Sequence, residues 1–499
     1  MIMKLKEQLS VKSINIMLFV IIFLIGLMVS LNYYDNDVYW IIAQGREILK
    51  HGIIYNNTMS INQNDKIVIQ QWLYDVIIAL IYDNFGDVGL YLWNFTGWLG
   101  LLACSFVFFK NKKFSFHLNC ISATLVASTF TYLNDRPECI TIILMLIECC
   151  ILEQVRKEEC NEKVLWFLPL IMLLEINLHA SLWLFHFIII LPYLIPFGKK
   201  IGIKNTQIPF NKFRIIILVM LAVMLLNPYG IDNVLYVFKS FTTLGKVNIA
   251  ELNMATMLSP YCWMQWLCII GIIISWYERK ITSVDLLMIS GITFLSFTVI
   301  RNNIFMPIAL VYTIPYFNLL FLKDGSKLQQ YLTKELYIMF VAIVLLLLSD
   351  GKTQLREMST FKKDVSENSK TADFIIDYLD KNTDKDTVRL FTGFSVGGIF
   401  EFNGYKVYMD ARPELHSSKI NGNDDFVDEY MSLRNSYDIK SKKILEIGDY
   451  ENFIVKYDFD YIVINNKYEN VFHMYLISQP NLYKNVCSNT YYSLYEVQK

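Results

Sequence analysis

The strongest constraint on the fold of this chain is a series of apolar runs whose lengths suit helices through a lipid bilayer. A hydrocarbon core about 30 Å thick needs roughly 20 apolar residues in helical conformation. Only 18% of the 499 residues are charged, below the roughly 25% of soluble domains, and the mean hydropathy is +0.35. The sequence therefore predicts an α-helical polytopic membrane protein with about eleven transmembrane helices, near residues 14–31, 88–109, 117–133, 139–154, 164–178, 181–197, 214–227, 261–277, 282–300, 303–322 and 333–349.

Lysine and arginine gather in alternate loops, and this pattern predicts the orientation of the helices. Cytoplasmic loops carry an excess of these residues, and the basic N-terminal segment lies on the same side as the basic loops. The apolar run after that segment is long for a signal peptide, so we expect an uncleaved first helix with a cytoplasmic N-terminus. An odd number of spans then places the C-terminus on the extracytoplasmic side of the cell (plasma) membrane.

The last third of the chain differs from the rest. Residues 1–350 are predicted to form the multi-spanning membrane domain, with a first outer loop at 32–87, and residues 351–499 an extracytoplasmic soluble α/β domain. Charge returns after residue 350 and the apolar runs shorten to strand length. We expect strands in VRLFTGF, KVYMD and DYIVINN, and a helix in TADFIIDYL.

The first outer loop begins with two acids directly after a membrane-grade run, in NYYDNDVYWIIAQGREILKHG. From Val38 the apolar residues recur at helical spacing, which predicts a helix lying in the membrane interface with its apolar stripe, through Leu49, in lipid. Asp37 would lie at the start of that helix, where a carboxylate is favoured. Asp35 and Asp37 are therefore either solvated acids at a helix start or part of a reaction centre. A second helix is predicted in QQWLYDVIIALIYDNFG.

Other outward-facing helix ends also carry polar residues. They include Asp135, Arg136 and Glu138, then Glu175, Asn177 and His179, then Asn227 and Tyr229, and finally Arg301. Each has an ordinary structural interpretation, such as an ion pair or a helix end. Because ionisable residues at membrane depth usually face a cavity or a partner, their recurrence on one side of the membrane favours a common pocket.

Such a pocket suits a particular chemistry. An aspartate can act as general base toward a hydroxyl, and an arginine can hold a phosphate by charge-assisted hydrogen bonds. The aromatic residues Trp40, Trp72 and Tyr229 offer faces for sugar rings or anchors at the headgroup level. This combination favours glycosyl transfer from a polyprenyl-phosphate-linked sugar.

The sequence resembles a bacterial family of multi-spanning proteins that belong to, or neighbour, the GT-C superfamily of glycosyltransferases. The protein O-mannosyltransferase-like and lipid-A-sugar transferases are among these relatives. The resemblance starts at YDNDVYWIIAQGREILKHGIIYNNTMSIN and continues in RPECITIILMLI, INLHASLW, LNPYG, RNNIFMPIAL and GFSVGGIFEFNGYKVYMDARPEL. The chain departs from the family at Gln70 and Gln71, where relatives tend to have His-Glu.

The resemblance implies a GT-C-like core with a catalytic acid in the first outer loop. By carry-over, Asp37 is the favoured general base and Asp35 its alternative or orienting partner, while Arg136 and Arg301 are candidates for the donor phosphate. Asp410 and Arg412, in DARPELHSS, form either a glycan-binding patch or a salt-bridged turn that holds the outer domain onto the membrane core. The candidates for lining the site are Trp40, Trp72, Asn177, His179, Asn227 and Tyr229.

The expected partners are a polyprenyl-phosphate sugar donor, membrane lipid, and an extracytoplasmic glycan, lipid or protein acceptor, with no nucleic acid. We expect no cofactor, since the nine cysteines form no CxxC pair and no Gly-rich phosphate loop is present. A divalent metal at Asp35 and Asp37 stays an alternative, although two acids alone are a weak metal signal. The competing functions are a lipid-linked glycan transporter and a non-catalytic cell-envelope assembly protein.

Overall fold

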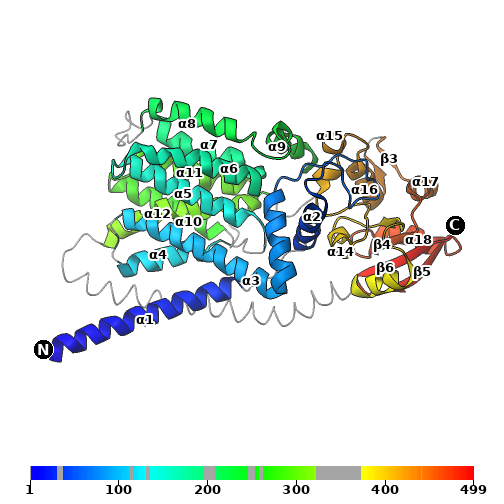
Figure 1. Ribbon diagram of the computed structural model, residues 1–499, viewed down its shortest axis with the longest axis horizontal. Helices are drawn as coiled ribbons and strands as arrows, with labels where there is room; N and C mark the ends of the chain where they lie inside the picture. Colours follow the sequence, from blue (N-terminus) through cyan, green and yellow to red (C-terminus); the bar gives the residue numbers. More distant parts are fainter. Residues whose placement is uncertain are drawn as a thin grey trace. The chain divides into compact units, whose positions relative to one another are not determined.

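The chain folds into two compact units (Figure 1). Unit 1 contains residues 1–33, 87–226 and 250–354, and unit 2 contains residues 34–86, 227–249 and 355–499. The first outer loop thus belongs to the same unit as the C-terminal region. The structure is a computed structural model that describes residues 2–30, 37–112, 114, 116–130, 135–195, 208–244, 253–254, 257, 262–321, 372–439 and 441–499.

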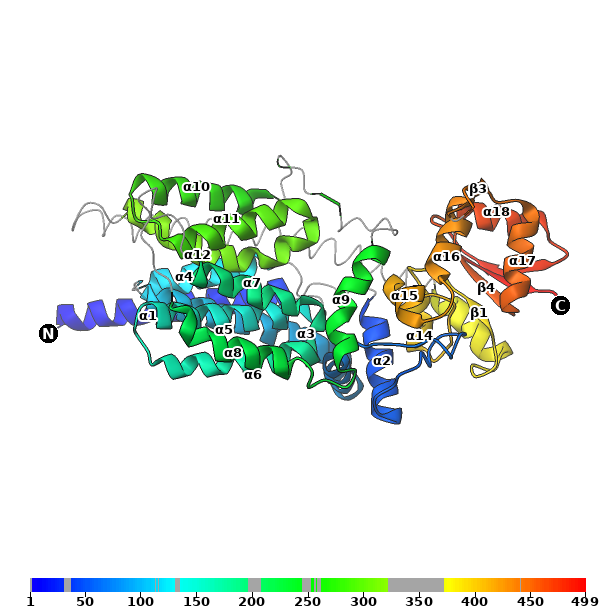
Figure 2. The same ribbon diagram turned by 90° about the horizontal axis from the view of Figure 1, so that it is seen from above.

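Unit 1 is a bundle of α-helices, in which α5 packs on α6 and α7, and α10 packs on α11 and α12 (Figure 2). Its described elements are α1 (Ile2–Ser30), residues 87–111 of α3 (Trp72–Asn111), α4 (Phe116–Ser128), α5 (Glu138–Arg156), η1 (Glu162–Trp166), α6 (Phe167–Leu178), η2 (Ala180–Leu182), α7 (Trp183–Leu194), α8 (Phe210–Val223), α10 (Trp263–Tyr277), α11 (Ser283–Thr298), η6 (Ile300–Phe305) and α12 (Met306–Phe321).

The helices of unit 1 overlap the predicted spans from 14–31 to 303–322, whereas the span predicted at 333–349 lies outside the described residues. Among the described helices, Trp72–Asn111 alone is long and apolar enough by itself to cross a membrane, and others are apolar but shorter. The count of eleven spans therefore stays a prediction. Large apolar side chains such as Phe19, Leu218 and Ile273 are more than half exposed on the outside of the bundle. A surface of this kind suits contact with lipid.

Helix α3 consists of two segments that meet at Gly86. This glycine has φ 57° and ψ −149°, outside the helical region, and it separates residues 72–85 from residues 87–111. A left-handed φ is accessible to glycine without a Cβ clash. The boundary coincides with the one predicted between the second helix of the outer loop and the second span.

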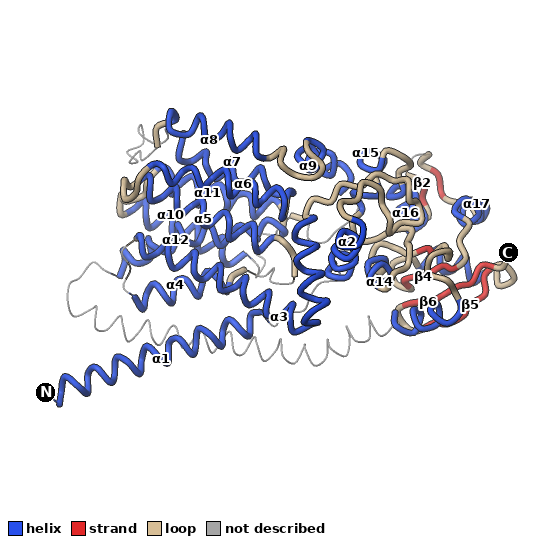
Figure 3. Tube along the Cα trace, in the orientation of Figure 1, coloured by secondary structure: helices blue, strands red, loops and turns tan. Residues whose placement is uncertain are grey.

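The C-terminal part of unit 2 is an α/β domain, as predicted, around a mixed four-stranded sheet of order β1-β4-β6-β5 (Figure 3). Strand β1 (Leu390–Phe391) is parallel to β4 (Tyr461–Asn465), and β6 (Tyr492–Val497) is antiparallel to β4 and to β5 (Tyr483–Ser488). A short hairpin joins β2 (Tyr437–Asp438) to β3 (Lys443–Ile444).

Helices cover both faces of this sheet. Alternate side chains of β4 point to opposite faces, so each face has its own apolar residues for a helix to pack on. Ile462 and Ile464 pack with α16 (Phe426–Asn435), α17 (Ile447–Tyr457) and α18 (Asn470–Ser478). On the other face, Tyr461 and Val463 pack with α14 (Gly397–Phe402) and with a helix over residues 372–382, which is the helix predicted in TADFIIDYL. Apolar residues on both faces of a strand, as in β4 from Tyr461 to Ile464, are typical of a central position in the sheet.

The predicted strand KVYMD instead connects this domain to the first outer loop. Val407 forms single bridges to Leu390 on one side and to Ser60 on the other. Its N–H donates to the carbonyl of Met59 at 2.9 Å, and its carbonyl accepts from the N–H of Ile61 at 3.0 Å. The outer loop thereby extends the sheet edge.

Further helices complete unit 2. Helix α2 (Asp37–His51) packs on α14, and α9 (Ile231–Leu244) packs on α15 (Ser418–Asn421) and on η7 (Pro413–His416). The helix predicted after Asp37 is therefore confirmed, but its expected lipid contact is wrong for most of the stripe. Val38, Ile41, Ile42 and Ile48 are buried within the protein, whereas Leu49 is exposed.

The contact between α2 and α3 predicts that Gly45 tolerates no side chain. A Cβ at Gly45 would lie 2.1 Å from the carbonyl oxygen of Asp75. Because a backbone atom cannot yield, Gly45→Ala should lower the free energy of unfolding by at least about 1–3 kcal/mol, the usual cost of overpacking. Gly448→Ala in α17, where a Cβ meets nothing within 4 Å, should instead raise it by about 0.5–1 kcal/mol. Equal melting temperatures for wild type and Gly45→Ala would contradict the α2–α3 contact.

A buried carboxyl in the outer domain predicts a pH-dependent stability. Burial raises the pKa of Glu469 from 4.5 to about 7, although its carboxylate accepts from Asn465 N and Tyr430 Oη. Between pH 4.5 and 7 the folded chain holds a proton that the unfolded chain has released. The free energy of unfolding should therefore fall by roughly 3 kcal/mol as the pH rises through this window.

Thermal unfolding of the full-length protein between pH 4.5 and 8 measures this effect. Glu469→Gln should remove that part of the pH dependence, since the amide does not titrate. Glu451→Gln, which changes an exposed glutamate of α17, serves as the matched control and should leave the slope unchanged. An unaltered slope in Glu469→Gln would assign the pH dependence to other groups.

Candidate functional site

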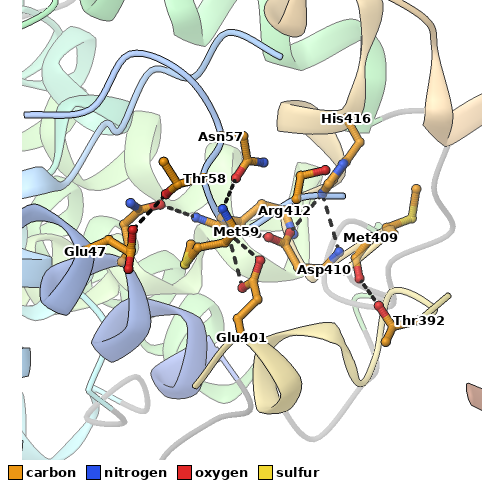
Figure 4. Close-up of polar contacts among 12 residues, drawn as sticks. Glu47, Asn57, Thr58, Met59, Thr392, Glu401, Met409, Asp410, Arg412 and His416 are labelled. Carbon is orange, nitrogen blue, oxygen red and sulfur yellow. Dashed lines mark hydrogen bonds and ion pairs between the residues drawn. The ribbon is translucent and has the colours of Figure 1, made fainter. Parts of the chain in front are cut away.

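A buried group of charged side chains surrounds Arg412 in unit 2, with Glu401, Asp410 and His416 directed toward it (Figure 4). Arg412 Nε donates to Asp410 Oδ2 at 2.9 Å, Nη2 binds the same carboxylate, and Nη1 donates to Gln44 Oε1 at 2.9 Å. Arg412 Nη2 also lies 3.3 Å from Glu401 Oε1, and His416 Nε2 lies 3.3 Å from Asp410 Oδ1. Arg412 is 6% exposed and Asp410 is fully buried.

The electrostatics of this group favour one ion pair beside a neutral carboxyl. Burial opposes the charge of Asp410, but Arg412 and His416 hold its pKa well below the usual range. Burial, together with the nearby Asp410, raises the pKa of Glu401 well above its usual range. Burial also lowers the pKa of Arg412, but Asp410 and Glu401 raise it by more, so the guanidinium stays charged. A buried ion pair of this kind stabilises the fold only while both charged groups and their hydrogen-bond partners are present, because removal of one leaves an uncompensated buried charge.

The same arginine fixes helix α2. Its guanidinium carbon lies 4.5 Å from the centre of a Trp40 ring, and Trp40 is 8% exposed. Together with the bond to Gln44, this cation–π contact attaches the first outer loop to the C-terminal domain inside unit 2. Of the two alternatives for Asp410 and Arg412, the geometry favours the salt-bridged turn, and one face of the Trp40 indole is already occupied.

Asp37 is the first residue of α2 and is partly buried. A carboxylate in the first turn of a helix is favoured by the unpaired N–H groups there and by the positive end of the dipole. A role in stabilising the helix and a role in a reaction are both compatible with this position. Asp35 lies outside the described residues.

Three other predicted lining residues stabilise unit 2 locally. Tyr229 Oη donates to the carbonyl of Ile54 at 2.9 Å. The Asn227 side chain accepts from Tyr229 N at 2.9 Å and donates to the carbonyl of Gly230 at 3.0 Å, which closes a turn. Trp72 is half-buried against the apolar cluster that contains Ile54.

In unit 1, three predicted site residues meet at Glu138. Arg301 Nη2 lies 2.7 Å from Glu138 Oε1, and the charges of His179 and Arg136 also act on this carboxylate. Glu138 is the first residue of α5, Arg301 lies in η6 and His179 lies between α6 and η2. Two guanidinium groups thus act on one carboxylate, and guanidinium groups suit an anionic ligand.

A cavity of about 110 Å³ opens beside Arg136, lined also by Asn94, Trp93, Ile140 and Ile143. Asn94 Oδ1 accepts from the backbone N–H of Asp135 at 3.1 Å. The cavity is thus lined by the polar side chains of Asn94 and Arg136 and by apolar side chains of α3 and α5.

Asp135 itself combines a buried carboxyl with an uncommon backbone conformation. It is 1% exposed and has φ 61°, in the left-handed region. Burial raises the pKa of its carboxyl to about 8. A left-handed non-glycine residue with a buried carboxyl marks a position where backbone strain accompanies a candidate site.

The remaining predicted residues of unit 1 have defined partners. Asn177 Nδ2 donates to the carbonyls of Leu173 and Leu226 at 2.9 and 3.0 Å, which joins the ends of α6 and α8. His179 Nδ1 lies 2.9 Å from Thr141 Oγ1, which in turn donates to Glu175. Asn177 thus joins two helix ends, and His179 connects the start of α5 to the interior of unit 1.

Sequence reasoning did not select Gln44, Glu401 or His416 as site residues, and it placed Glu138 near a common pocket without giving it a role. Glu401 had a signal, because it is an acid between two phenylalanines in an apolar segment. Gln44 had no comparable signal. Within the described ranges, no group of three or more His, Cys, Asp or Glu residues is arranged to hold a metal ion. The metal alternative at Asp35 and Asp37 stays a prediction, because Asp35 is not described.

Comparison with known proteins identifies the fold. No protein-family model and no curated protein match the sequence. The structure is similar to that of an oligosaccharyltransferase from Archaeoglobus fulgidus, solved with an acceptor peptide containing the NVT sequon tethered by a disulfide bond. The TM-score is 0.60 at 10% identity, over 98% of this chain and 74% of that one. The chain thus has the fold of that oligosaccharyltransferase, in agreement with the predicted GT-C-like architecture.

The Arg412 group predicts a large loss of stability when one partner is removed. Arg412→Gln leaves Asp410 buried without its main counter-charge and should lower the free energy of unfolding by about 3–5 kcal/mol. Thermal unfolding of the full-length protein measures the change.

A double variant and a surface control make this test specific. Asp410→Asn combined with Arg412→Gln should recover much of the loss, because both charges are then absent. Arg434→Gln removes a partly exposed arginine that lies 5.3 Å from the Tyr468 ring centre and should cost about 1 kcal/mol or less. An Arg412 variant as stable as the wild type would exclude the group as a structural clamp.

Proposed function

We propose that this chain is a membrane glycosyltransferase that moves a sugar from a polyprenyl-phosphate-linked donor to an extracytoplasmic hydroxyl. The acceptor is a glycan, a lipid or a protein. The GT-C-like fold supports the reaction class. The proposal further takes the N-terminus as cytoplasmic and the C-terminal domain as extracytoplasmic, in agreement with the distribution of Lys and Arg in the loops.

The observation that carries this proposal is the positive cluster at the start of α5. Arg136 and Arg301 act on the single carboxylate of Glu138. Two guanidinium groups therefore lie near one another, and guanidinium groups bind phosphate through two parallel hydrogen bonds. We assign the donor phosphate to Arg136 and Arg301 on this basis.

The cavity beside Arg136 supports a lipid carrier rather than a nucleotide. Asn94 lines it as a further polar side chain, and Trp93, Ile140 and Ile143 form the apolar wall. A volume of about 110 Å³ is well below that of a pocket for a whole ligand of drug size. It suits a phosphate with the first carbons of a prenyl chain.

Asp37 is the proposed general base. In a single displacement the acceptor oxygen forms the bond to the anomeric carbon while the bond from that carbon to the phosphate oxygen breaks. The anomeric configuration is thereby inverted. The acceptor proton passes to Asp37, and the phosphate leaves with the electron pair of the broken bond, stabilised by the arginines. Asp35 is the alternative base. His179 is proposed to line the site.

A lipid-linked glycan transporter is the second candidate, because one observation favours it. Proton- or ion-coupled transporters use charged residues deep in the bundle, and the sequence appeared to offer charges at one face only. In unit 1, however, His186 Nδ1 lies 2.6 Å from Glu148 Oε2 and Nε2 lies 3.6 Å from Glu175 Oε2, all three fully buried.

Sugar transfer from radiolabelled polyprenyl-phosphate donors tests the proposed enzyme. Asp37→Asn should lower kcat by about 10²–10⁴-fold, the usual contribution of a general base, with little change in donor KM. Arg136→Gln should instead raise the donor KM, because it removes a phosphate ligand from the ground state as well as the transition state. Assays with and without EDTA and added Mg²⁺ or Mn²⁺ test the metal alternative.

Glu47→Gln provides the matched control for Asp37→Asn. Glu47 lies on the same helix and accepts a hydrogen bond from Thr58 at 3.0 Å, so its variant should keep wild-type transfer. Full activity in Asp37→Asn would reassign the base to Asp35 or another group. Absence of transfer from every donor, together with movement of a lipid-linked glycan across vesicles, would favour the transporter. Absence of both would favour the non-catalytic assembly protein.

A further inference from the structure

The interior of unit 1 contains a row of buried polar and titratable side chains along α5, of which only His179 has a role in the proposed transfer reaction. At its N-terminal end along α5, His179 Nδ1 lies 2.9 Å from Thr141 Oγ1, and Thr141 Oγ1 lies 3.0 and 3.1 Å from the two carboxylate oxygens of Glu175. Glu175 Oε2 lies 3.6 Å from His186 Nε2, and His186 Nδ1 lies 2.6 Å from Glu148 Oε2. These side chains come from α5, α6 and α7, which pack together.

The row continues toward the C-terminal end of α5. Cys149 lies next to Glu148 on the chain and interacts with the hydroxyl of Tyr312. The Tyr312 and Tyr193 hydroxyls are hydrogen-bonded to each other, and Tyr193 Oη donates to Glu153 Oε1 at 3.1 Å. Glu153 then pairs with Lys112 and Arg156 at that end of the bundle.

The side chains of this row are buried, so water does not stabilise charges on them. Thr141, Glu148, Glu175 and His186 are fully buried, and His179 is 4% exposed. Glu148 Oε1 is also buried without a hydrogen-bond partner in the described part of the chain. Two carboxylates and an imidazolium leave one net negative charge, and the triad is neutral only when one carboxyl group is protonated as well. Since an isolated charge is very costly in such surroundings, this triad holds an exchangeable proton.

Each group in the row can both donate and accept a hydrogen bond in one of its protonation states. From Thr141 to Glu153 the row follows α5 over about 18 Å at 1.5 Å per residue, more than half of a hydrocarbon core of roughly 30 Å. Ionisable residues at this depth typically mark proton or ion pathways.

We propose that unit 1 conducts protons along α5, through His179, Thr141, Glu175, His186, Glu148, Cys149, Tyr312, Tyr193 and Glu153. A proton that binds His179 displaces the Nδ1 proton to the Thr141 hydroxyl, whose own proton passes to Glu175. His186 accepts a proton at Nε2 and releases the one at Nδ1 to Glu148. Each step forms one N–H or O–H bond and breaks another, so no oxidant or co-reactant is required. The hydroxyl and imidazole groups then reorient before the next proton passes.

This activity is independent of glycosyl transfer, and it can be measured without knowledge of the sugar. Full-length protein is reconstituted into liposomes that contain a pH-sensitive dye, and a potassium gradient with valinomycin sets the membrane potential. Wild-type protein should acidify the lumen faster than protein-free liposomes do.

Substitutions at Thr141 separate proton transfer from packing. Thr141→Val keeps the volume but removes the hydroxyl, and it should reduce the flux to that of protein-free liposomes. Thr141→Ser keeps the hydroxyl but loses the methyl group, and it should conduct. Glu148→Gln should also abolish the flux, because the amide retains a hydrogen bond with His186 but carries no exchangeable acidic proton.

Gln265→Met is the control for removal of a buried polar group elsewhere in unit 1. Gln265 is fully buried on α10 and donates to Asn303 Oδ1, outside the row, so the variant should conduct as the wild type does. All variants are compared at equal incorporation after size-exclusion chromatography shows a single folded species. Wild-type flux equal to that of empty liposomes would overturn the proposal, as would equal fluxes in Thr141→Val and wild type.

Discussion

The charge of Arg412 is the constraint on which the organisation of unit 2 depends. A buried guanidinium is tolerated only when its donors are satisfied and its charge is balanced, and the partners here come from distant parts of the chain. Asp410 supplies the counter-charge, and Glu401 lies beside Arg412 as a neutral carboxyl. From the first outer loop, Gln44 accepts a hydrogen bond from the guanidinium and Trp40 packs its ring against it. The C-terminal domain therefore also determines the orientation of α2, the helix that begins with Asp37.

Unit 1 also contains buried charged groups that require partners of opposite charge. Its buried carboxylates lie along α5, where Glu138 pairs with Arg301 of η6, Glu148 with His186 of α7, and Glu153 with Lys112 and with Arg156 of α5 itself. The pair at the start of the helix belongs to the proposed donor site, whereas Glu148 and Glu153 have no role in the proposed displacement. The two proposals thus concern mainly different segments of one helix.

Much of the fold was predictable from local patterns. Apolar runs of helical length predicted the helices of the bundle, and the period of α2 was visible from Val38 to Ile48 because one side of that helix is apolar. The α/β character after residue 350 followed from shorter apolar runs such as that of β4. The pairing of KVYMD could not be predicted in this way. Its hydrogen bonds go to the first outer loop as well as to the C-terminal domain, and no local pattern specifies the first outer loop as a partner.

The sequence by itself determined which residue types are available near the ends of the helices, and it correctly indicated that Arg136, His179 and Arg301 belong to one side of the bundle. It also indicated a GT-C-like architecture. Tertiary structure alone decided that these three meet at Glu138, that Arg412 binds Gln44, and that the apolar stripe of α2 is covered by protein rather than lipid. The physical reason is that apolar periodicity shows which face of a helix avoids water. It does not show whether lipid or another part of the chain covers that face, nor which distant charge balances a buried one.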